Sequence, residues 1–310
     1  MKGRYFREWS VAIGLGLLLA VMAVVAPAFF DPQPMLSRLT REAPTLVLAC
    51  AMALIIISRQ IDISVGSQFA VCSVVAGLLA AAQLPLFVVL LGSVGAGALL
   101  GALNGSLVAG LRLPSIVVTL ATMVILRQAL RWLRQGQYVE LPDGFQWFGL
   151  SQSVGQWSII GLALGLLLFL ALAMKHFSAG RFVYALGSDP EAARLAGMRP
   201  QILTFGIFVF MGAFAGLAAL MNIVQSRQVD PMSGSGLELK AIAAAVVGGV
   251  AISGGRGNLW GVFVGLLLLA SVNPALTYLS VAPYWEKAIQ GAIILLAVVA
   301  DGLRNRRQNS

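Results

Sequence analysis

The sequence has little charge. Only 11% of its 310 residues are Asp, Glu, Lys or Arg, while 59% are hydrophobic. A soluble domain of this length needs more charged side chains to cover its surface, so a single water-soluble domain is excluded. The many long apolar runs instead fit a bilayer, where about 20 apolar residues cross the hydrocarbon core as a helix. The composition therefore predicts a polytopic membrane protein.

Histidine and cysteine are also scarce, which limits the chemistry available to the chain. The single histidine, His176, stands in a polar connector, whereas Cys50 and Cys72 both lie in apolar runs. Metal sites and nucleophilic catalysis need several such side chains close together. We therefore expect two buried, inert thiols, no metal and no cofactor.

No phosphate-binding loop of the common kind is present. The sequence contains no Gly-Lys pair, so the G-x-x-x-x-G-K-[ST] loop that holds ATP phosphates is missing. The segment GGRGNLWG (254–261) is rich in glycine, but it follows no soluble strand and better fits a tight connection between membrane helices. The chain is predicted not to be an enzyme, with any ATP hydrolysis on a partner subunit.

Ten apolar segments are predicted to be transmembrane helices, several of them short or interrupted by glycine. They are 11–30, 44–58, 66–82, 86–110, 114–133, 157–175, 202–222, 237–252, 258–279 and 285–303. The second and third can form one unit broken around 58–66, which a membrane tolerates only where protein or a watery cavity surrounds the break. The predicted fold class is an all-α polytopic membrane protein in which residues 1–310 form a single transmembrane domain.

Glycine recurs at every fourth position in several of these spans, including Gly97, Gly101 and Gly105 in one span and Gly212 and Gly216 in another. Between membrane helices such glycines let the backbones approach closely, so we expect a tightly packed bundle. The segments IDISVGS (61–67) and AISGGRG (251–257) echo each other weakly. An internal duplication would explain the echo.

The first span allows two interpretations. Lys2, Arg4 and Arg7 precede an apolar run that ends at the tripeptide APA, as in a cleavable signal peptide. Because the rest of the chain is itself polytopic, we favour an uncleaved first span.

The positive residues predict the orientation of the chain. Lys and Arg are about twice as frequent in the connectors expected on the same side of the membrane as the N-terminus as in those on the other side. In membrane proteins this excess marks the cytoplasmic side. Both termini and the connector 176–201 are therefore expected in the cytoplasm. The net charge of +9 does not indicate a nucleic-acid partner, because the positive residues are scattered rather than clustered on one face.

A short amphipathic helix is predicted inside this connector, at about 188–198. Asp189 can accept hydrogen bonds at its N-terminus, and Pro190 suits its first turn. Gly197 can end the helix in a left-handed conformation. Such a helix can lie on the lipid headgroups or dock onto a cytoplasmic partner.

Ionisable side chains are few within the predicted spans and stand near their ends. They are Asp62, Glu238, Lys240, Glu286 and Lys287. Carriers coupled to protons or sodium usually place such groups deep in the membrane. Their absence from the span centres favours energy supplied from outside the chain.

Five segments, in order along the chain, resemble the permease subunits of bacterial ABC importers, and in particular the ribose-type sugar permeases. They are SRQIDISVGS (58–67), LNGSLVAGLRLPSIVVTLATM (103–123), GRFVYALGSDPEAARLAGM (180–198), GLELKAIAAAVVGGVAISGGRGNLWG (236–261) and PYWEKAIQGAIILLAV (283–298). Within the third, EAARLAG fits the EAA-x-x-x-G pattern of these permeases, although the I-x-L-P ending is absent.

This resemblance implies a permease subunit that moves a small sugar or sugar-like solute across the bacterial inner membrane. It further implies a cytoplasmic ABC ATPase subunit, a periplasmic substrate-binding protein and a second permease subunit, identical or paralogous, embedded beside it in the membrane lipid. The main alternative is a self-sufficient secondary carrier or channel for a small polar solute.

Two sets of candidate functional residues follow. The resemblance implies that the 188–198 helix couples the chain to the ATPase, through Asp189, Glu191, Ala192, Ala193, Arg194 and Gly197. Broken, glycine-rich segments beside polar groups point to a translocation pathway, near Asp62, Ser64, Gly66, Asn104 and Glu238.

The sequence also departs from the family pattern. Arg59 and Gln60 replace a Gly pair usual in the ribose-type branch, and Lys240 stands where an acidic residue is common. Arg131 and Arg134 add positive charge at an outer helix end, where they either anchor the helix in the interface or meet acidic residues of the binding protein. These departures leave the identity of the solute open.

Overall fold

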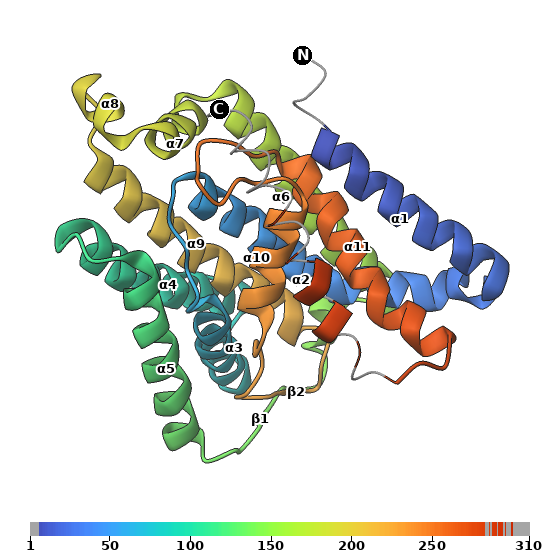
Figure 1. Cartoon of the computed structure of the whole chain (residues 1–310). Coiled ribbons are helices and arrows are strands. Elements are labelled where there is room, and N and C mark those ends of the chain that lie inside the picture. Colours follow the sequence, from blue (N-terminus) through green and yellow to red (C-terminus); the bar gives the residue numbers. More distant parts are fainter. Residues whose placement is uncertain are drawn as a thin grey trace.

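The computed structural model describes residues 6–282 and, beyond them, Trp285, 287–289, 291–293, Leu295 and Val299. The described residues form a bundle of helices with one short two-stranded ribbon (Figure 1). The tenth predicted span, 285–303, and both ends of the chain lie largely outside these residues.

The elements follow one another in this order: α1 (Phe6–Val25), η1 (Pro27–Phe30), α2 (Pro32–Ile57), α3 (Val65–Ala81), α4 (Leu86–Gly105), the π-helical η2 (Ser106–Gly110), α5 (Ser115–Arg134), β1 (Val139–Glu140), η3 (Gln146–Gly149), α6 (Gln152–His176), α7 (Ser178–Ser188), α8 (Pro190–Leu195), α9 (Pro200–Ile223), β2 (Gln228–Val229), α10 (Leu237–Val247) and α11 (Leu259–Tyr278). The strands pair antiparallel, with Val139 opposite Val229.

The all-α fold class is confirmed, and each of the first nine predicted spans has a helix in the structure. Within the described residues, six helices are long and apolar enough to cross a bilayer: α2, α4 with η2, α5, α6, α9 and α11. The apolar parts of α1 and α3 are shorter. The count of ten membrane crossings stays a prediction.

The predicted span 237–252 was too long. The helix there, α10, has 11 residues. At about 1.5 Å per residue it extends about 16 Å, roughly half of a ~30 Å hydrocarbon core. It ends at Val247 because Gly248 and Gly249 follow, and Gly249 has a φ of +99°, which does not continue a helix.

Helix α2 is the centre of the bundle, because every residue from Ala43 to Ile57 is buried. It begins at Pro32 rather than near residue 44, since the polar first turns also continue as helix. Its end at Ile57 and the start of α3 at Val65 leave 58–64 without α-helix, at the place where the break was predicted.

The glycine spacing predicted close helix packing, which is tightest between α4 and α9. A Cβ atom added to Gly97 would overlap the carbonyl oxygen of Gly212, and one added to Gly212 would overlap that of Gly97. One turn away, the Ser93 hydroxyl donates a 2.7 Å hydrogen bond to the carbonyl oxygen of Gly216. The two backbones therefore touch directly. The same glycine spacing on α6, at Gly161 and Gly165, was misleading, because a Cβ atom at either position meets nothing within 4 Å among the described residues.

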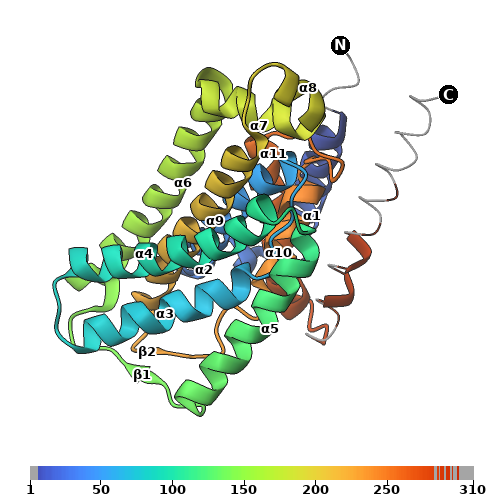
Figure 2. The same cartoon turned by 90° about the vertical axis from the view of Figure 1, so that its left-hand side faces the viewer.

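Helices α7 and α8 lie at one end of the bundle, and the β1–β2 ribbon lies at the opposite end (Figure 2). We call these the α8 end and the ribbon end. Helix α1 begins near the α8 end in both views. The connector 176–201 contains two helices rather than one, and the second is shorter than the predicted 188–198. Asp189 separates them, because its extended backbone, with a φ of −155°, interrupts the helix.

Two short helices, α3 and α10, are each preceded by an unwound segment that contains an aspartate turn. Asp62 Oδ1 accepts a hydrogen bond from the backbone nitrogen of Ser64 at 2.9 Å. Asp230 Oδ1 likewise accepts one from the backbone nitrogen of Met232 at 2.7 Å. Both unwound segments thus use the same local hydrogen-bond pattern.

The unwound segment before α10 packs against the first turn of α3. A Cβ atom on Gly66 would overlap the carbonyl oxygen of Gly234, and a Cβ atom on Gly234 would overlap that of Gly66. The segment that faces 61–67 is therefore the one that leads into α10. The segment 251–257, which echoes 61–67 in sequence, lies on the other side of α10 in the chain and leads into α11.

Candidate functional site

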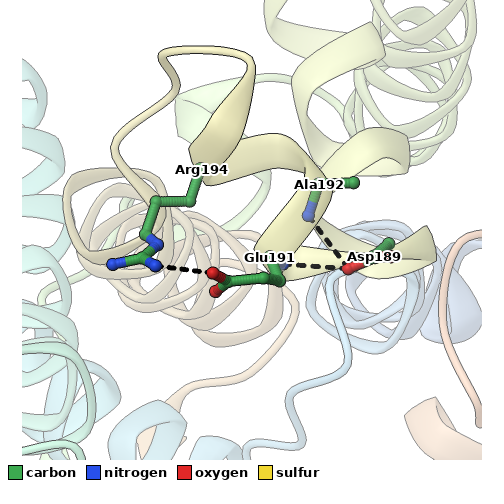
Figure 3. A network of polar contacts seen from close by, with 4 residues as sticks. All are labelled: Asp189, Glu191, Ala192 and Arg194. Atoms are coloured by element: carbon green, nitrogen blue, oxygen red, sulfur yellow. Dashed lines mark hydrogen bonds and ion pairs between the residues drawn. The ribbon is translucent and has the colours of Figure 1, made fainter.

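The N-terminus of α8 is held by one side chain. Asp189 Oδ1 accepts hydrogen bonds from the backbone nitrogens of Glu191 at 2.9 Å and of Ala192 at 3.0 Å (Figure 3). Pro190 occupies the first helical position, where its missing N–H has no partner to lose. This is the helix start that the sequence predicted.

The C-terminus of α8 is fixed by Gly197, which has a φ of +82°. Its backbone nitrogen donates to the carbonyl oxygen of Arg194 at 3.0 Å, and that of Met198 donates to Ala193 at 3.1 Å. These two bonds form a Schellman motif, which satisfies carbonyl groups that the helix itself leaves free. The predicted left-handed glycine is confirmed.

Most of the surface of α8 faces solvent. Ala193 is its buried residue, at 4% exposure, whereas Leu195 is 79% exposed. Arg194 and Glu191 form a 2.5 Å ion pair on the outer face, with both side chains more than 60% exposed (Figure 3). An exposed ion pair of this kind adds little to the stability of the helix. Both charged groups therefore remain available for contact with another molecule.

Three of the predicted pathway residues lie together, in a hydrogen-bonded chain that joins four elements. The Ser64 hydroxyl donates to Asp62 Oδ1 at 2.5 Å, and Asn104 Nδ2 donates to the Ser64 hydroxyl at 2.8 Å. Gln68 Nε2 donates to Asp62 Oδ2 at 2.9 Å. The Thr122 hydroxyl donates to Asn104 Oδ1 at 2.8 Å. We call these five residues the polar cluster.

The polar cluster is enclosed by protein: four of its members have no exposed surface, and Thr122 is 6% exposed. Polar groups in such a place are costly unless they are hydrogen-bonded. The hydrogen-bond donors to Asp62 are all neutral groups. Gln68 Oε1 is buried and has no hydrogen-bond partner among the described residues. The cluster can therefore accept one further donor.

Gly66 and Glu238 lie beside the cluster rather than in it. A Cβ atom on Gly66 would overlap Glu238 Oε2, so the carboxylate rests against the first turn of α3. Glu238 Oε1 accepts a 3.2 Å hydrogen bond from the backbone nitrogen of Gly236. Glu238 Oε2 is buried without a hydrogen-bond partner in the described part of the chain. The five predicted pathway residues thus form two adjoining groups.

The three arginines in the second half of α5 have different surroundings. Arg127 turns inward and donates to the carbonyl oxygens of Met232 at 3.3 Å and Ser233 at 3.0 Å. Arg134 donates to two carbonyl oxygens in the turn that follows α5. Arg131 approaches only the sulfur of Met232, at 3.4 Å, in the described contacts. Arg131 is therefore the one best placed to meet another protein.

Lys240 forms an ion pair with Glu42 of the central helix α2. Its Nζ lies 2.7 Å from Glu42 Oε1 on α2, and both side chains are mostly buried. The pair joins α10 to α2. As predicted, Cys50 and Cys72 are buried and free.

A cavity of about 550 Å³ lies at the α8 end. Its walls come from the segment after α2, the turn between η2 and α5, and the starts of α8 and α9, and they include Arg59 and Arg112. A second cavity of about 370 Å³, between α1, α2, α6 and α11, is almost wholly apolar.

The structure combines long apolar helices, buried polar groups beside a break between α2 and α3, and an exposed helix capped at both ends. These features fit a multi-pass membrane transport subunit. Residues 35–298 match the family described as "Branched-chain amino acid transport system / permease component". The chain belongs to this family of transport permeases.

Individual relatives agree with the family. The chain is 31% identical to the ribose import permease protein RbsC of Escherichia coli strain K12, over 98% of this chain and 97% of that protein. It is 34% identical to the autoinducer 2 import system permease protein LsrC of Enterobacter sp. strain 638, over 96% of this chain and 87% of that protein. No solved structure matches the chain.

The chain is therefore a multi-pass inner-membrane permease subunit of an ABC importer, as the sequence resemblance implied. It is not an enzyme, because ATP hydrolysis in such systems belongs to separate ATPase subunits. Its partners are an ATPase subunit and a substrate-binding protein. The alternative of a self-sufficient carrier or channel is not retained.

Proposed function

We propose that this permease imports a small polyhydroxylated solute of the sugar class. Residues 1–310 form one permease domain, which pairs in the lipid bilayer with a second permease subunit, identical or paralogous. The relatives named for ribose and for autoinducer 2 support this substrate class.

The α8 end faces the cytoplasm in this proposal, together with both termini. The excess of Lys and Arg in the connectors of that end supports the orientation. The start of α1 near the same end is consistent with it (Figure 2).

The observation that carries the proposal is the exposed, doubly capped helix α8. A free six-residue helix is far below the length that is stable alone, so its two caps keep it folded. Its exposed Leu195, beside the Glu191–Arg194 pair, offers an apolar anchor with a polar rim. We assign α8 to docking on the ATPase subunit, so that ATP-driven movement of that subunit displaces the α8 end.

The polar cluster, with Gly66 and Glu238 beside it, is the proposed translocation pathway. Its groups are amide, hydroxyl and carboxylate groups, which recognise sugar hydroxyls by exchanging hydrogen bonds. In the present conformation these groups bind one another. Transport then requires the unwound segment before α10 to separate from the first turn of α3, which exposes the cluster to the solute.

Uptake assays with radiolabelled pentoses, hexoses and deoxyhexoses, in a strain lacking the chromosomal gene, test the substrate class. Asn104→Ala should raise the KM for the transported sugar, because it removes one donor and one acceptor from the cluster. Gln156→Ala is the matched control, since Gln156 is an equally buried amide on α6 outside the cluster. An unchanged KM in Asn104→Ala would remove the cluster from the pathway, and uptake of none of these sugars would overturn the substrate class.

A further inference from the structure

Three chain segments meet at the α8 end through backbone contacts. The backbone nitrogen of Gly255, in the α10–α11 connection, donates to the carbonyl oxygen of Ile57 at 2.8 Å. A Cβ atom on Gly187, near the end of α7, would overlap the same carbonyl oxygen. The end of α2, the end of α7 and the α10–α11 connection are thus packed without intervening side chains.

One side chain ties these three segments together. Arg59 Nε donates to the carbonyl oxygen of Ser253 at 2.9 Å, and an Nη atom of Arg59 donates to that of Ser188 at 2.6 Å. The planar guanidinium group suits two acceptors at once. Ser188 is the last residue of α7, where backbone carbonyl groups lack helical partners and the helix dipole favours a positive charge.

The backbone of Arg59 is held in an unfavourable conformation. Its φ is +63°, in the left-handed region, where the Cβ atom crowds the following carbonyl oxygen and strains the backbone. Such a residue persists where the surrounding structure holds it in place. A glycine would adopt this φ without strain. Compared with glycine, arginine at this position therefore contributes its two side-chain hydrogen bonds.

The position of Arg59 in the chain connects the two proposed sites. Its acceptor Ser188 directly precedes Asp189, which caps α8. In the other direction, Arg59 stands three residues before Asp62 of the polar cluster, in the same unwound segment. A displacement of α8 therefore reaches the cluster through a short path of bonded groups.

We infer that Arg59 is a positioning residue for energy coupling: its guanidinium group binds the end of α7 to the segment that carries Asp62, so that movement of α8 displaces the polar cluster. This inference rests on the docking role proposed for α8. Arg59 touches neither ATP nor solute. Without it, only the backbone contacts at Ile57 join the end of α7 to the α2–α3 segment, and α8 then moves with less displacement of that segment.

The experiment uses the full complex of permease, ATPase subunits and substrate-binding protein, reconstituted in proteoliposomes. The measured quantity is solute taken up per ATP hydrolysed. Arg59→Gly removes both hydrogen bonds and the left-handed strain together, so thermal stability should not fall by as much as the lost bonds alone would cause. We expect ATPase association to stay normal and uptake per ATP to fall at least about fivefold, the lower end of typical coupling between sites. Arg59→Lys should give an intermediate value, because one ammonium group cannot span both acceptors equally well.

Arg112→Gly is the matched control. Arg112 lines the same cavity and also has a positive φ, of +56°, but makes no such pair of bonds within the described residues. It should leave uptake per ATP unchanged. Wild-type uptake per ATP in Arg59→Gly, or an equal loss in Arg112→Gly, would overturn the inference.

The docking role of α8 is judged separately, by ATPase association with a Gly197→Val variant. Lost association there, together with normal coupling in Arg59→Gly, would leave the docking role standing and remove only the role of Arg59. Normal association in Gly197→Val would instead refute the docking role on which the inference rests.

Discussion

Replacing Asp189 by alanine should weaken binding of the ATPase subunit. The Asp189 carboxylate satisfies two backbone N–H groups of α8, and loss of such a cap costs about 1 kcal/mol, within a range of roughly 0.5–2 kcal/mol. Because α8 has six residues, no other part of the helix can offset this cost. A change of about 1 kcal/mol alters the ratio of folded to unfolded α8 about fivefold.

If the ATPase binds only the folded helix, the apparent Kd rises by the factor by which the folded fraction falls. We therefore expect a Kd up to about fivefold higher for Asp189→Ala, by fluorescence titration of the ATPase onto the permease in nanodiscs. Asp189→Asn is the control, since asparagine caps helices as well as aspartate does. Equal affinity of the alanine and asparagine variants would refute the capping argument.

A second variant separates helix stability from direct contact. Glu191→Gln breaks the exposed pair with Arg194, which contributes about 0.3–0.5 kcal/mol, and removes a favourable negative charge from the first turn of α8, worth roughly 0.3–1 kcal/mol more. Through helix stability alone it should therefore raise the Kd by no more than about tenfold. A larger loss of affinity means that Glu191 touches the ATPase, whereas no loss beyond this limit confines Glu191 to the helix itself.

Three further outcomes are expected. Gly212→Ala should lower the free energy of unfolding by about 1–3 kcal/mol, seen as a lower melting temperature of the purified permease, because the added Cβ meets a backbone carbonyl of α4. Gly206→Ala on the same helix has open space and should leave the melting temperature unchanged. Ser178→Cys should react with an impermeant maleimide only after spheroplasts are opened, whereas Asp143→Cys at the ribbon end should react in intact ones; the reverse result would invert the orientation. Arg131→Gln should weaken association with the substrate-binding protein and reduce its salt dependence, and unchanged association at low salt would assign this side chain to interfacial anchoring.

The features that the sequence predicted well are local ones. The start and end of α8 depend on residues within a few positions of each other, since Asp189 bonds to backbone groups two and three residues ahead and Gly197 closes the last turn. Glycine spacing likewise indicated a close helix contact, although not which helices would meet. Helix α7 was not predicted, although the helix start predicted at Asp189 lies directly after it, because Ser178–Ser188 was taken as part of a polar connector.

The features that the sequence could not predict depend on pairs far apart in the chain. Gln68 and Thr122 stand in apolar runs, where a single polar residue has no periodic signal, and only the fold brings them to the polar cluster. Lys240 and Glu42 are 198 positions apart, so neither indicates the other. The signal that was available for Gln68 is its spacing, one helical turn after Ser64, which places both side chains on one face of α3.

The contact between α4 and α9 has a consequence for how this permease can vary. At an ordinary contact, a larger side chain on one helix can be offset by a smaller one on the other. Gly97 and Gly212 leave no such exchange, because each lies against the backbone of the other and neither has a side chain to shorten. Genetic suppressors of a substitution at either position must therefore arise at other sites, by shifting a whole helix, and cannot be found at the partner glycine.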